Sequence, residues 1–272
     1  MKNIFHLTSA HSRYDTRIFL KECSTLSKNG FNTLLFVSDQ IDNEKINNVI
    51  IKNLNYKRNK SRLIKTIFFY LNFLKVLKKK HPDIIHFHDP ELIFLGALLK
   101  KKGYRVVYDM HENTHLQILQ KKFSPIFLLK LISIVFFFLE KKISGYFDGL
   151  IFATNAIKKS HSNFSGKNRI INNFPIIDDL NHYPKKRTNS REIIYVGGIN
   201  RVRGIIPLVN SLHKSNFKLN LVGNFLESDL HEKLLKLDGW KNVIYHGFCD
   251  RKKIDKLMSR SIAGIVTFMS AP

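Results

Sequence analysis

Residues 195–209, YVGGINRVRGIIPLV, join two apolar runs, the second with helical spacing, through a turn rich in glycine and arginine. A helix start offers unpaired N–H groups and a partial positive charge, and a guanidinium group matches the oxygens of a phosphate. The pattern therefore predicts an anion site, with a tight turn carrying exposed arginines as the alternative. The candidate residues are Gly197, Gly198, Arg201, Arg203 and Gly204.

Polar residues also follow the first apolar run of the chain. After NIFHL comes TSAHSRYDTR, whose His11, Arg13 and Asp15 are candidates for contact with a polar substrate. The alternative is a solvated loop in which Asp15 or Thr16 caps the next helix. This loop lacks the G-x-G-x-x-G pattern of dinucleotide sites, which disfavours a nicotinamide enzyme.

Histidines and acids follow two later apolar runs. DIIHFH places His86 and His88 on one face of a strand, and Asp89 then begins a helix, although buried histidines and helix-start acids also have purely structural roles. After VVYDM, His111 and Glu112 are suited to orient a sugar hydroxyl or to exchange a proton near neutral pH. The spacing is not that of an H-E-x-x-H site, so we expect no metal.

The elements that must position these groups alternate along the chain, strand-like runs with helix-like runs. Such alternation predicts α/β units with doubly wound parallel sheets, and ligands bind such sheets beyond the carboxyl ends of the strands. The pattern lapses at 173–190, which is rich in Asn, Pro and charge. We therefore predict a first domain at 1–172, a linker at 173–190 and a second domain at 191–272.

The amino-acid composition limits the kinds of molecule that this protein is expected to bind. The 272 residues contain 45 Lys and Arg against 21 Asp and Glu, a net charge of +24, which favours nucleic acid, acidic membranes or phosphorylated small molecules. The distant Cys23 and Cys249 support neither a disulfide framework nor a zinc site and fit a cytoplasmic location. The longest apolar stretch, 126–139, is too short to span a bilayer and predicts either a buried helix or a membrane-surface helix. Its flanking lysines are Lys121, Lys122, Lys141 and Lys142.

Five motifs in order, HLTSAHSRYDTRIF, IIHFHDPEL, VVYDMHEN, YVGGINRVRGI and GW…VIYHGF, resemble those of the retaining glycosyltransferases of family 4, which have the GT-B fold. The resemblance covers nearly the whole chain. It implies two Rossmann-like domains, the first binding the acceptor and the second a nucleotide-diphosphate sugar, with no cofactor or metal required. The acceptor-binding residues would be His11, Arg13, Asp15, His88 and Asp89.

The resemblance also implies roles for the remaining candidates. His111 matches the active-site histidine of the family, which holds the transferred sugar, and Glu112 lies beside it as the second catalytic candidate. Arg203 matches the basic residue before Gly204, whereas Gly198 occupies the more common arginine position, so Arg201 substitutes for it. These arginines and glycines would face the diphosphate of the donor.

We thus expect sugar transfer to a saccharide or lipid-linked acceptor in cell-surface polysaccharide biosynthesis, as for lipopolysaccharide or capsule, by a cytoplasmic protein peripheral to the inner face of the plasma membrane. A pair of glutamates eight positions apart, typical of the family, has no counterpart, so we expect an incomplete second domain and little activity. One alternative is an inactive remnant that retains acceptor or membrane binding. Another is a basic nucleic-acid-binding protein, disfavoured because no recognition motif is visible.

Overall fold

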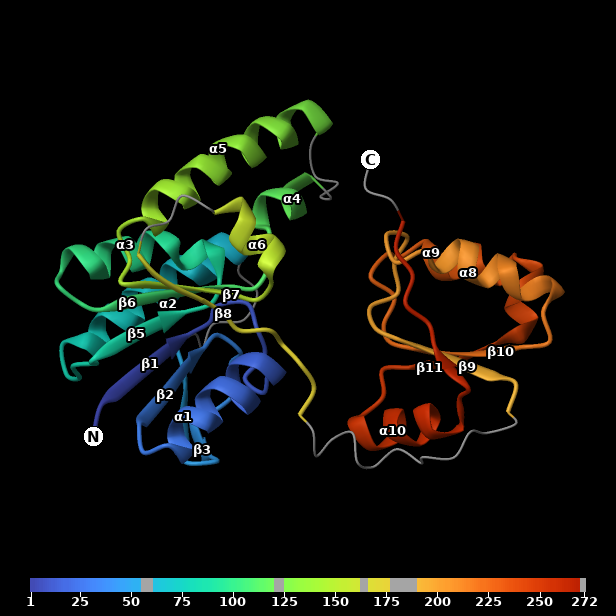
Figure 1. Cartoon of the computed structure of the whole chain (residues 1–272), viewed down its shortest axis with the longest axis horizontal. Helices are drawn as coiled ribbons and strands as arrows, with labels where there is room; N and C mark the ends of the chain where they lie inside the picture. The colour runs from blue at the N-terminus through green and yellow to red at the C-terminus, as the bar shows by residue number, and fades with distance from the viewer. Residues whose placement is uncertain (55–60, 120–124, 162–165, 177–189, 270–272) are drawn as a thin grey trace. The chain divides into compact units, whose positions relative to one another are not determined.

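The chain divides into two units, unit 1 (Met1–Asn173) and unit 2 (Phe174–Pro272), each with its own sheet (Figure 1). The computed structural model describes residues 1–54, 61–119, 125–161, 166–176 and 190–269. Most of the linker predicted at 173–190 lies outside the described residues.

The sheet of unit 1 has the strand order β3-β4-β2-β1-β5-β6-β7-β8. All neighbouring strands are parallel except β3 and β4. The strands β2, β4 and β3 lie on one side of β1, and β5 to β8 lie on the other side. The strand order therefore reverses between β1 and β5. The strands are β1 (Asn3–Leu7), β2 (Asn32–Val37), β3 (Glu44–Ile46), β4 (Val49–Asn53), β5 (Ile84–Phe87), β6 (Val106–Met110), β7 (Gly149–Phe152) and β8 (Lys167–Ile170).

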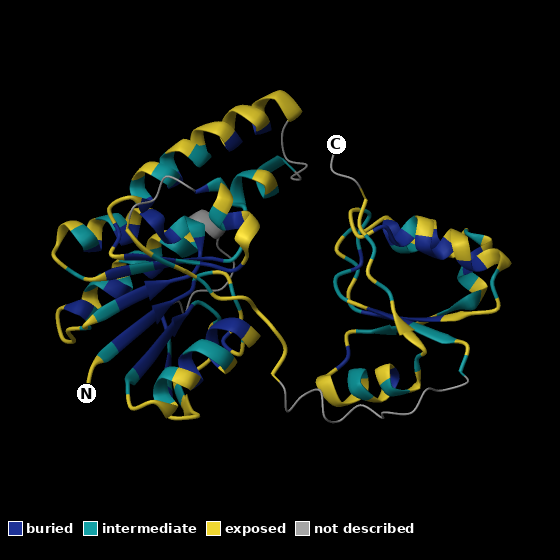
Figure 2. Ribbon diagram, viewed as in Figure 1, coloured by how far each residue is buried: buried dark blue, intermediate teal, exposed yellow. Residues whose placement is uncertain are grey.

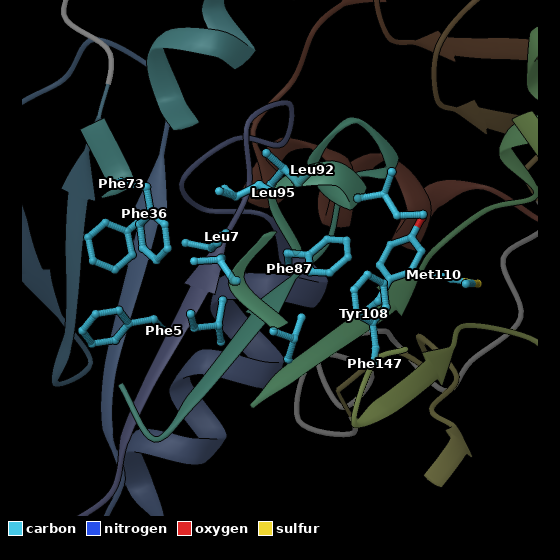
Figure 3. Packing of buried hydrophobic residues seen from close by; sticks show 14 of the residues in the cluster. Phe5, Leu7, Phe36, Phe73, Phe87, Leu92, Leu95, Tyr108, Met110 and Phe147 are labelled. Atoms are coloured by element: carbon cyan, nitrogen blue, oxygen red, sulfur yellow. The ribbon is translucent and has the colours of Figure 1, made fainter. Parts of the chain in front are cut away.

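Helices cover both faces of this sheet, whose central strands are buried (Figure 2). On one face, alternate residues of the central strands form an aromatic core with Phe73 of α2, as Figure 3 shows. Phe87 of β5 stacks on Tyr108 of β6 with ring centroids 4.4 Å apart. The helices of unit 1 are η1 (Thr16–Cys23), α1 (Ser24–Lys28), α2 (Arg62–Leu77), η2 (Pro90–Leu92), α3 (Ile93–Lys101), α4 (Thr114–Leu119), α5 (Ile126–Ser144) and α6 (Asn155–Ser160).

The opposite face of the sheet is covered by η1, a π-helix. Asp15 caps it by accepting hydrogen bonds from the backbone N–H groups of Arg17 and Ile18, both at 2.9 Å. Ile18 and Phe19 pack on β2 and β4 in an apolar cluster. Toward the carboxyl ends of β1, β5 and β6, by contrast, this face carries polar side chains, because the alternation of these strands directs His6, His86 and Asp109 away from the aromatic core.

Sequence patterning missed the β3–β4 hairpin, the one antiparallel pair among the described strands of unit 1. Asn47 and Asn48 form its two-residue turn with φ of 52° and 60°. Asparagine tolerates this left-handed region, and two such residues in succession match the twist of a hairpin. The short run before Asn47 offered too little alternation to predict a strand.

Helix α5 is not the all-round buried helix expected as one alternative. It buries only Leu129, Ser133, Glu140 and Ser144, and the rest of its length is largely exposed (Figure 2). Phe127, Leu131 and Phe138 are 72%, 57% and 64% exposed. Among the described helices, none combines the length and the apolar character needed to cross a membrane. The flanking Lys121 and Lys122 lie outside the described residues.

Unit 2 has a four-stranded parallel sheet in the order β11-β10-β9-β12. Its order also reverses, between β9 and β12. Leu219 and Leu221 pack under α8 and α9, while Ile194 and Val222 pack under α10. The strand β12 is only two residues long, and beyond it Met269 donates its backbone N–H to the carbonyl of Val202. The elements are β9 (Glu192–Val196), α8 (Ile205–Ser211), η3 (Leu212–Lys214), β10 (Lys218–Val222), α9 (Leu230–Leu235), η4 (Asp238–Asn242), β11 (Val243–Gly247), α10 (Arg251–Arg260) and β12 (Ala263–Gly264).

Candidate functional site

A pocket of about 200 Å³ lies in unit 1 beside the loops that follow β1, β5 and β6. Doubly wound sheets bind ligands beyond the carboxyl ends of the strands where the strand order reverses, and this pocket occupies that position. It brings together five of the predicted residues of this unit. They are His11, His88, Asp89, His111 and Glu112, and the other lining residues are Ala10, Pro90, Tyr108, Thr114 and Gln117.

Asp89 is a buried anion that holds the loop after β1. Its carboxylate accepts hydrogen bonds from the Thr8 hydroxyl at 2.8 Å and the Ala10 N–H at 3.1 Å, and His11 Nδ1 lies 2.7 Å away. Burial alone would raise the pKa of Asp89, but these hydrogen bonds outweigh it and lower the pKa to about 2. The hydrogen bond to Asp89 raises the pKa of His11. Asp89 therefore positions His11 at the pocket wall.

Asp109 is a second buried anion, and sequence reasoning did not single it out. Arg17 donates to both of its oxygens, at 2.9 and 2.8 Å, and His111 Nε2 lies 2.8 Å away. His88 Nδ1 is 3.4 Å from the same carboxylate. Burial opposes ionisation, but the hydrogen bonds from His111, His88 and Arg17 hold the pKa of Asp109 well below its usual range. A charged residue inside the apolar run VVYDM, two positions before His111, was the signal available in the sequence.

The contact with Asp109 orients His111. An ionised carboxylate at Nε2 places a proton on that nitrogen, which leaves Nδ1 as the acceptor of a neutral imidazole. The buried carboxylate of a hydrolase triad sets tautomer and ring orientation in the same manner. Glu112 is exposed at the pocket. The site therefore offers two imidazoles held by buried carboxylates, His11 and His111, and one solvated carboxylate to a polar ligand.

Arg13 and Asp15, two of the expected acceptor-binding residues, do not line the pocket. Arg13 is buried, and its guanidinium forms ion pairs with Asp39 and Glu44 and donates to the carbonyls of residues 41 and 42. These partners use its donors, so Arg13 fixes the segment before β3. Asp15 caps η1 through two backbone N–H groups, which is the alternative that the sequence left open.

In unit 2, glycines end three neighbouring strands, with Gly197 after β9, Gly223 after β10 and Gly247 closing β11. A Cβ atom on Gly223 would lie 1.9 Å from the carbonyl oxygen of Gly197, so only glycine fits there. Gly204 precedes α8 with φ of 64°, a conformation that glycine adopts without strain. Gly198 accepts a hydrogen bond from the Tyr195 hydroxyl at 2.9 Å. The edge of the sheet therefore presents backbone rather than side chains.

The two predicted arginines differ in environment. Arg201 forms ion pairs with Glu227 and Asp229, so acidic partners already use much of its guanidinium. Arg203 is exposed, and its guanidinium stacks on the ring of Phe268 at 4.6 Å from the centroid. Phe268 follows β12 and Arg203 follows β9, so the pair lies where the strand order of unit 2 reverses. Arg203 is therefore the better placed of the two to bind an anion.

Comparison with known proteins gives one family match and many related folds. A family model described as Glycosyltransferase Family 4 matches residues 16–174, more than half of the chain. No curated protein sequence matches the chain.

Solved structures resemble the chain over nearly its full length. Sucrose-phosphate synthase from Thermosynechococcus elongatus matches with a TM-score of 0.73 at 16% identity, over 98% of this chain and 75% of its own. HepE from Anabaena, solved with UDP and glucose, matches with a TM-score of 0.69 at 13% identity, over 98% of this chain and 74% of its own. The lipopolysaccharide outer core galactosyltransferase WaaB matches with a TM-score of 0.62 at 16% identity, over 98% of this chain and 74% of its own.

These neighbours confirm the predicted fold class. Sucrose-phosphate synthase and WaaB are GT-B glycosyltransferases, and the present chain shares their α/β architecture of parallel sheets. About a quarter of each neighbouring chain has no counterpart here, which is consistent with the expected incomplete second domain.

Proposed function

The chain belongs to Glycosyltransferase Family 4, and on this premise we propose that it moves a sugar, with retention of configuration, from a nucleotide-diphosphate sugar to a saccharide or lipid-linked acceptor. The pathway that we propose is the assembly of a cell-surface polysaccharide. The observation that carries the proposal is the pocket of unit 1, in which Asp109 orients His111 where the strand order reverses. Two of the similar structures were solved with UDP or a UDP sugar, which supports a donor of this class.

The donor end of the reaction is assigned to unit 2. Breaking a glycosyl–phosphate bond builds negative charge on the leaving diphosphate, and a fixed cation stabilises that charge. Arg203 is exposed and held against Phe268, and the neighbouring strand ends carry glycines that let a phosphate approach the backbone. We assign Arg203 and Gly197, Gly198 and Gly204 to the diphosphate, and Arg201 to holding the loop through Glu227.

The sugar and acceptor end is assigned to unit 1. Nδ1 of His111 is suited to accept a hydrogen bond from a sugar hydroxyl, and His11 and Glu112 lie in the same pocket. We expect His111→Ala to lower the transfer rate strongly and to lower the free energy of unfolding only slightly, since Arg17 still pairs with the buried Asp109 when the imidazole is removed. Equal transfer by a folded His111→Ala chain would remove His111 from the reaction.

Nucleotide binding tests the donor assignment directly. In calorimetry with UDP and other nucleoside diphosphates, Arg203→Ala should lose about 1.5–3 kcal/mol of affinity, roughly 10- to 150-fold, because a charge-assisted contact is removed. Arg251→Ala is the matched control, since Arg251 is an exposed arginine of the same unit on α10 that pairs with Asp255. If Arg203→Ala binds each nucleotide as tightly as the parent chain, the assignment is wrong.

The surface of α5 supports a peripheral membrane location. Its exposed face carries Phe127, Leu131 and Phe138, and its C-terminal turn carries Lys141 and Lys142. Apolar side chains beside basic residues bind the interface of anionic membranes. This face would hold the enzyme near a lipid-linked acceptor. The net charge of +24 also favours binding to an anionic membrane surface.

A further inference from the structure

A cluster of buried imidazoles lies in unit 1 on the sheet face opposite the aromatic core. His6 on β1 and His86 on β5 are partners in the strand register, and His88 follows two residues later on the same side. The ring centroids of His6 and His86 are 4.6 Å apart, and those of His86 and His88 are 4.5 Å apart. A carboxylate oxygen of Glu22, from η1, lies within 4.8 Å of a ring nitrogen of each histidine. The two strands and the helix thus place four potential ligands together.

This cluster is poorly satisfied by hydrogen bonds. Within the described part of the chain, His6 Nε2 and His86 Nε2 have no hydrogen-bond partner. His6 is fully buried and His86 is 7% exposed, so bulk water does not replace the missing partners. Unpaired polar atoms in a native interior call for an explanation, of which an unseen ion is one. His6 Nδ1 and His88 Nε2 bond to each other at 3.0 Å, so the unpaired nitrogens of His6 and His86 are the atoms that point to a ligand.

The protonation of the rings suits a cation. A neutral imidazole keeps a lone pair on one ring nitrogen, and the buried Nε2 atoms of His6 and His86 have no hydrogen-bond partner within the described residues. Neutral imidazole nitrogens and carboxylate oxygens are the common ligands of zinc. One carboxylate with three imidazoles also suits a divalent transition metal better than Mg²⁺ or Ca²⁺, which prefer oxygen ligands.

We propose that His6, Glu22, His86 and His88 bind one divalent transition-metal ion, with zinc as the ion that best fits these ligands. Their ligand atoms all lie within 4.8 Å of one another. Zinc bonds of about 2.0–2.2 Å place tetrahedral ligands somewhat closer together, so small side-chain rotations complete the site. Four protein ligands form a closed site, which is typical of structural zinc.

Neighbouring charges favour this cluster over the second one that could hold a metal, His88 with Asp109 and His111. Asp109 is already engaged by Arg17 through two hydrogen bonds and by His111. Arg17 Nε also lies 3.1 Å from Glu22, but neither Glu22 oxygen has a hydrogen-bond partner within the described residues, and the carboxyl releases its proton when it binds the metal. The ion would join η1 to β1 and β5 and fix His88, which lines the pocket.

The test uses the full chain without a histidine tag, stripped with a chelator and then dialysed against zinc. Elemental analysis should find one zinc per chain, and the melting temperature should rise when zinc is restored. Cobalt(II) should give the intense visible absorption of a tetrahedral site. His86→Ala and Glu22→Gln should lose the bound metal, whereas His213→Ala, an exposed histidine of unit 2, should retain it.

His111→Ala separates the two clusters, because it removes a ligand of the second cluster and none of the first. Retention of zinc by this variant supports the proposal, and loss of zinc overturns it. Failure of the folded parent chain to hold stoichiometric zinc, or retention by both His86→Ala and Glu22→Gln, also overturns it. Should His86→Ala fail to fold, the Glu22→Gln variant and the cobalt spectrum of the parent chain decide the question.

Discussion

Burial and hydrogen bonding have opposite effects on the pKa values of the carboxyl groups in and beside the pocket. Burial alone would raise the pKa of Asp89 and of Asp109, yet hydrogen bonds lower both. Glu22 is the opposite case, because burial and the nearby Asp109 raise its pKa to about 9. The number of donors facing each carboxyl therefore decides which acid is ionised. In this way Asp89 and Asp109 become fixed anions that hold His11 and His111.

The pair His11–Asp89 predicts a stability contribution with two pH limits. The pKa of His11 is raised from 6.5, so its contribution is complete below about pH 6.5 and is lost as the pH rises through the raised value. The pKa of Asp89 is lowered from 3.8 to about 2, so its contribution is complete above about pH 3.8 and is lost as the pH falls toward 2. The coupling should therefore be greatest between about pH 4 and 6.5.

A double-mutant cycle measures this coupling. Urea denaturation of the parent chain, His11→Gln, Asp89→Asn and the double variant gives the interaction free energy at each pH. We expect a larger value near pH 5 than near pH 9. A coupling that stays constant across this range contradicts the pairing, while titration of His11 by NMR checks the direction of its pKa shift independently.

Replacing Asp109 should affect both stability and transfer. Asp109→Asn removes the ionised carboxylate that accepts two hydrogen bonds from the buried Arg17, and breaking a buried pair typically costs about 3–5 kcal/mol of unfolding free energy. It also removes the carboxylate that sets the tautomer of His111, so transfer should fall by a factor on the order of 10²–10⁴ in the chain that stays folded.

Asp148→Asn is the control for this comparison, since Asp148 pairs with Lys100 at the surface. Exposed ion pairs contribute about 0–1 kcal/mol to the free energy of unfolding, so Asp148→Asn should change stability little. Chemical denaturation of both variants checks the contrast. Equal stability losses would show that Asp109 and Arg17 do not form the buried pair described above.

At the scale of the element, α5 predicts membrane binding through one face. The double variant Phe127→Ser and Leu131→Ser removes two exposed apolar side chains, each of which gains about 1.5–3 kcal/mol when fully buried. Partial insertion should therefore still cost at least about tenfold in binding to anionic vesicles, measured by cosedimentation. Phe248→Ser is the control, because Phe248 of unit 2 is 79% exposed. Equal binding by the double variant and the parent would exclude this face.

At the scale of the whole molecule, the two units differ in the cores that hold them. Unit 1 contains the large aromatic cluster around Phe87, whereas unit 2 has two smaller clusters on the faces of a four-stranded sheet. Val266 and Phe268, beside the two-residue β12, are 80% and 61% exposed. Because unit 2 buries less apolar surface than unit 1, its elements should unfold locally at a smaller cost in free energy.

Limited proteolysis of the full chain should therefore cut residues 190–272 before residues 1–173. The expected product is an N-terminal fragment, identified by mass spectrometry, that persists while peptides from unit 2 accumulate. Nucleoside diphosphate should slow the cutting of unit 2 if Arg203 binds it, since a ligand stabilises the state that it binds. Earlier cutting within β1, β5 or β6 would contradict the difference in core size.

Much of the fold could be predicted from the sequence, because alternation and helix signals are local. The apolar runs at β1, β5 and β6 and the glycine-rich turn after β9 all lie where these signals indicate. The hairpin at Asn47 was missed, and the sequence left open whether α5 is buried or exposed. Hydropathy records how apolar a helix is, whereas its exposure depends on which neighbours pack against it.

The sequence by itself determined that this chain is an α/β protein with polar groups at the ends of its strands, and it identified five of the residues that line the pocket. Only the tertiary structure decided what those groups contact. Arg17 and Asp109 are 92 residues apart, and His6 and His88 are 82 apart, so the parallel pairing of β1, β5 and β6 was needed to join them. Likewise, the sequence alone does not distinguish Arg201 from Arg203. In the structure Arg201 forms ion pairs with Glu227 and Asp229. Arg203 instead stacks on the ring of Phe268. Local sequence sets which atoms a residue offers, while long-range packing sets their partners, burial and charge.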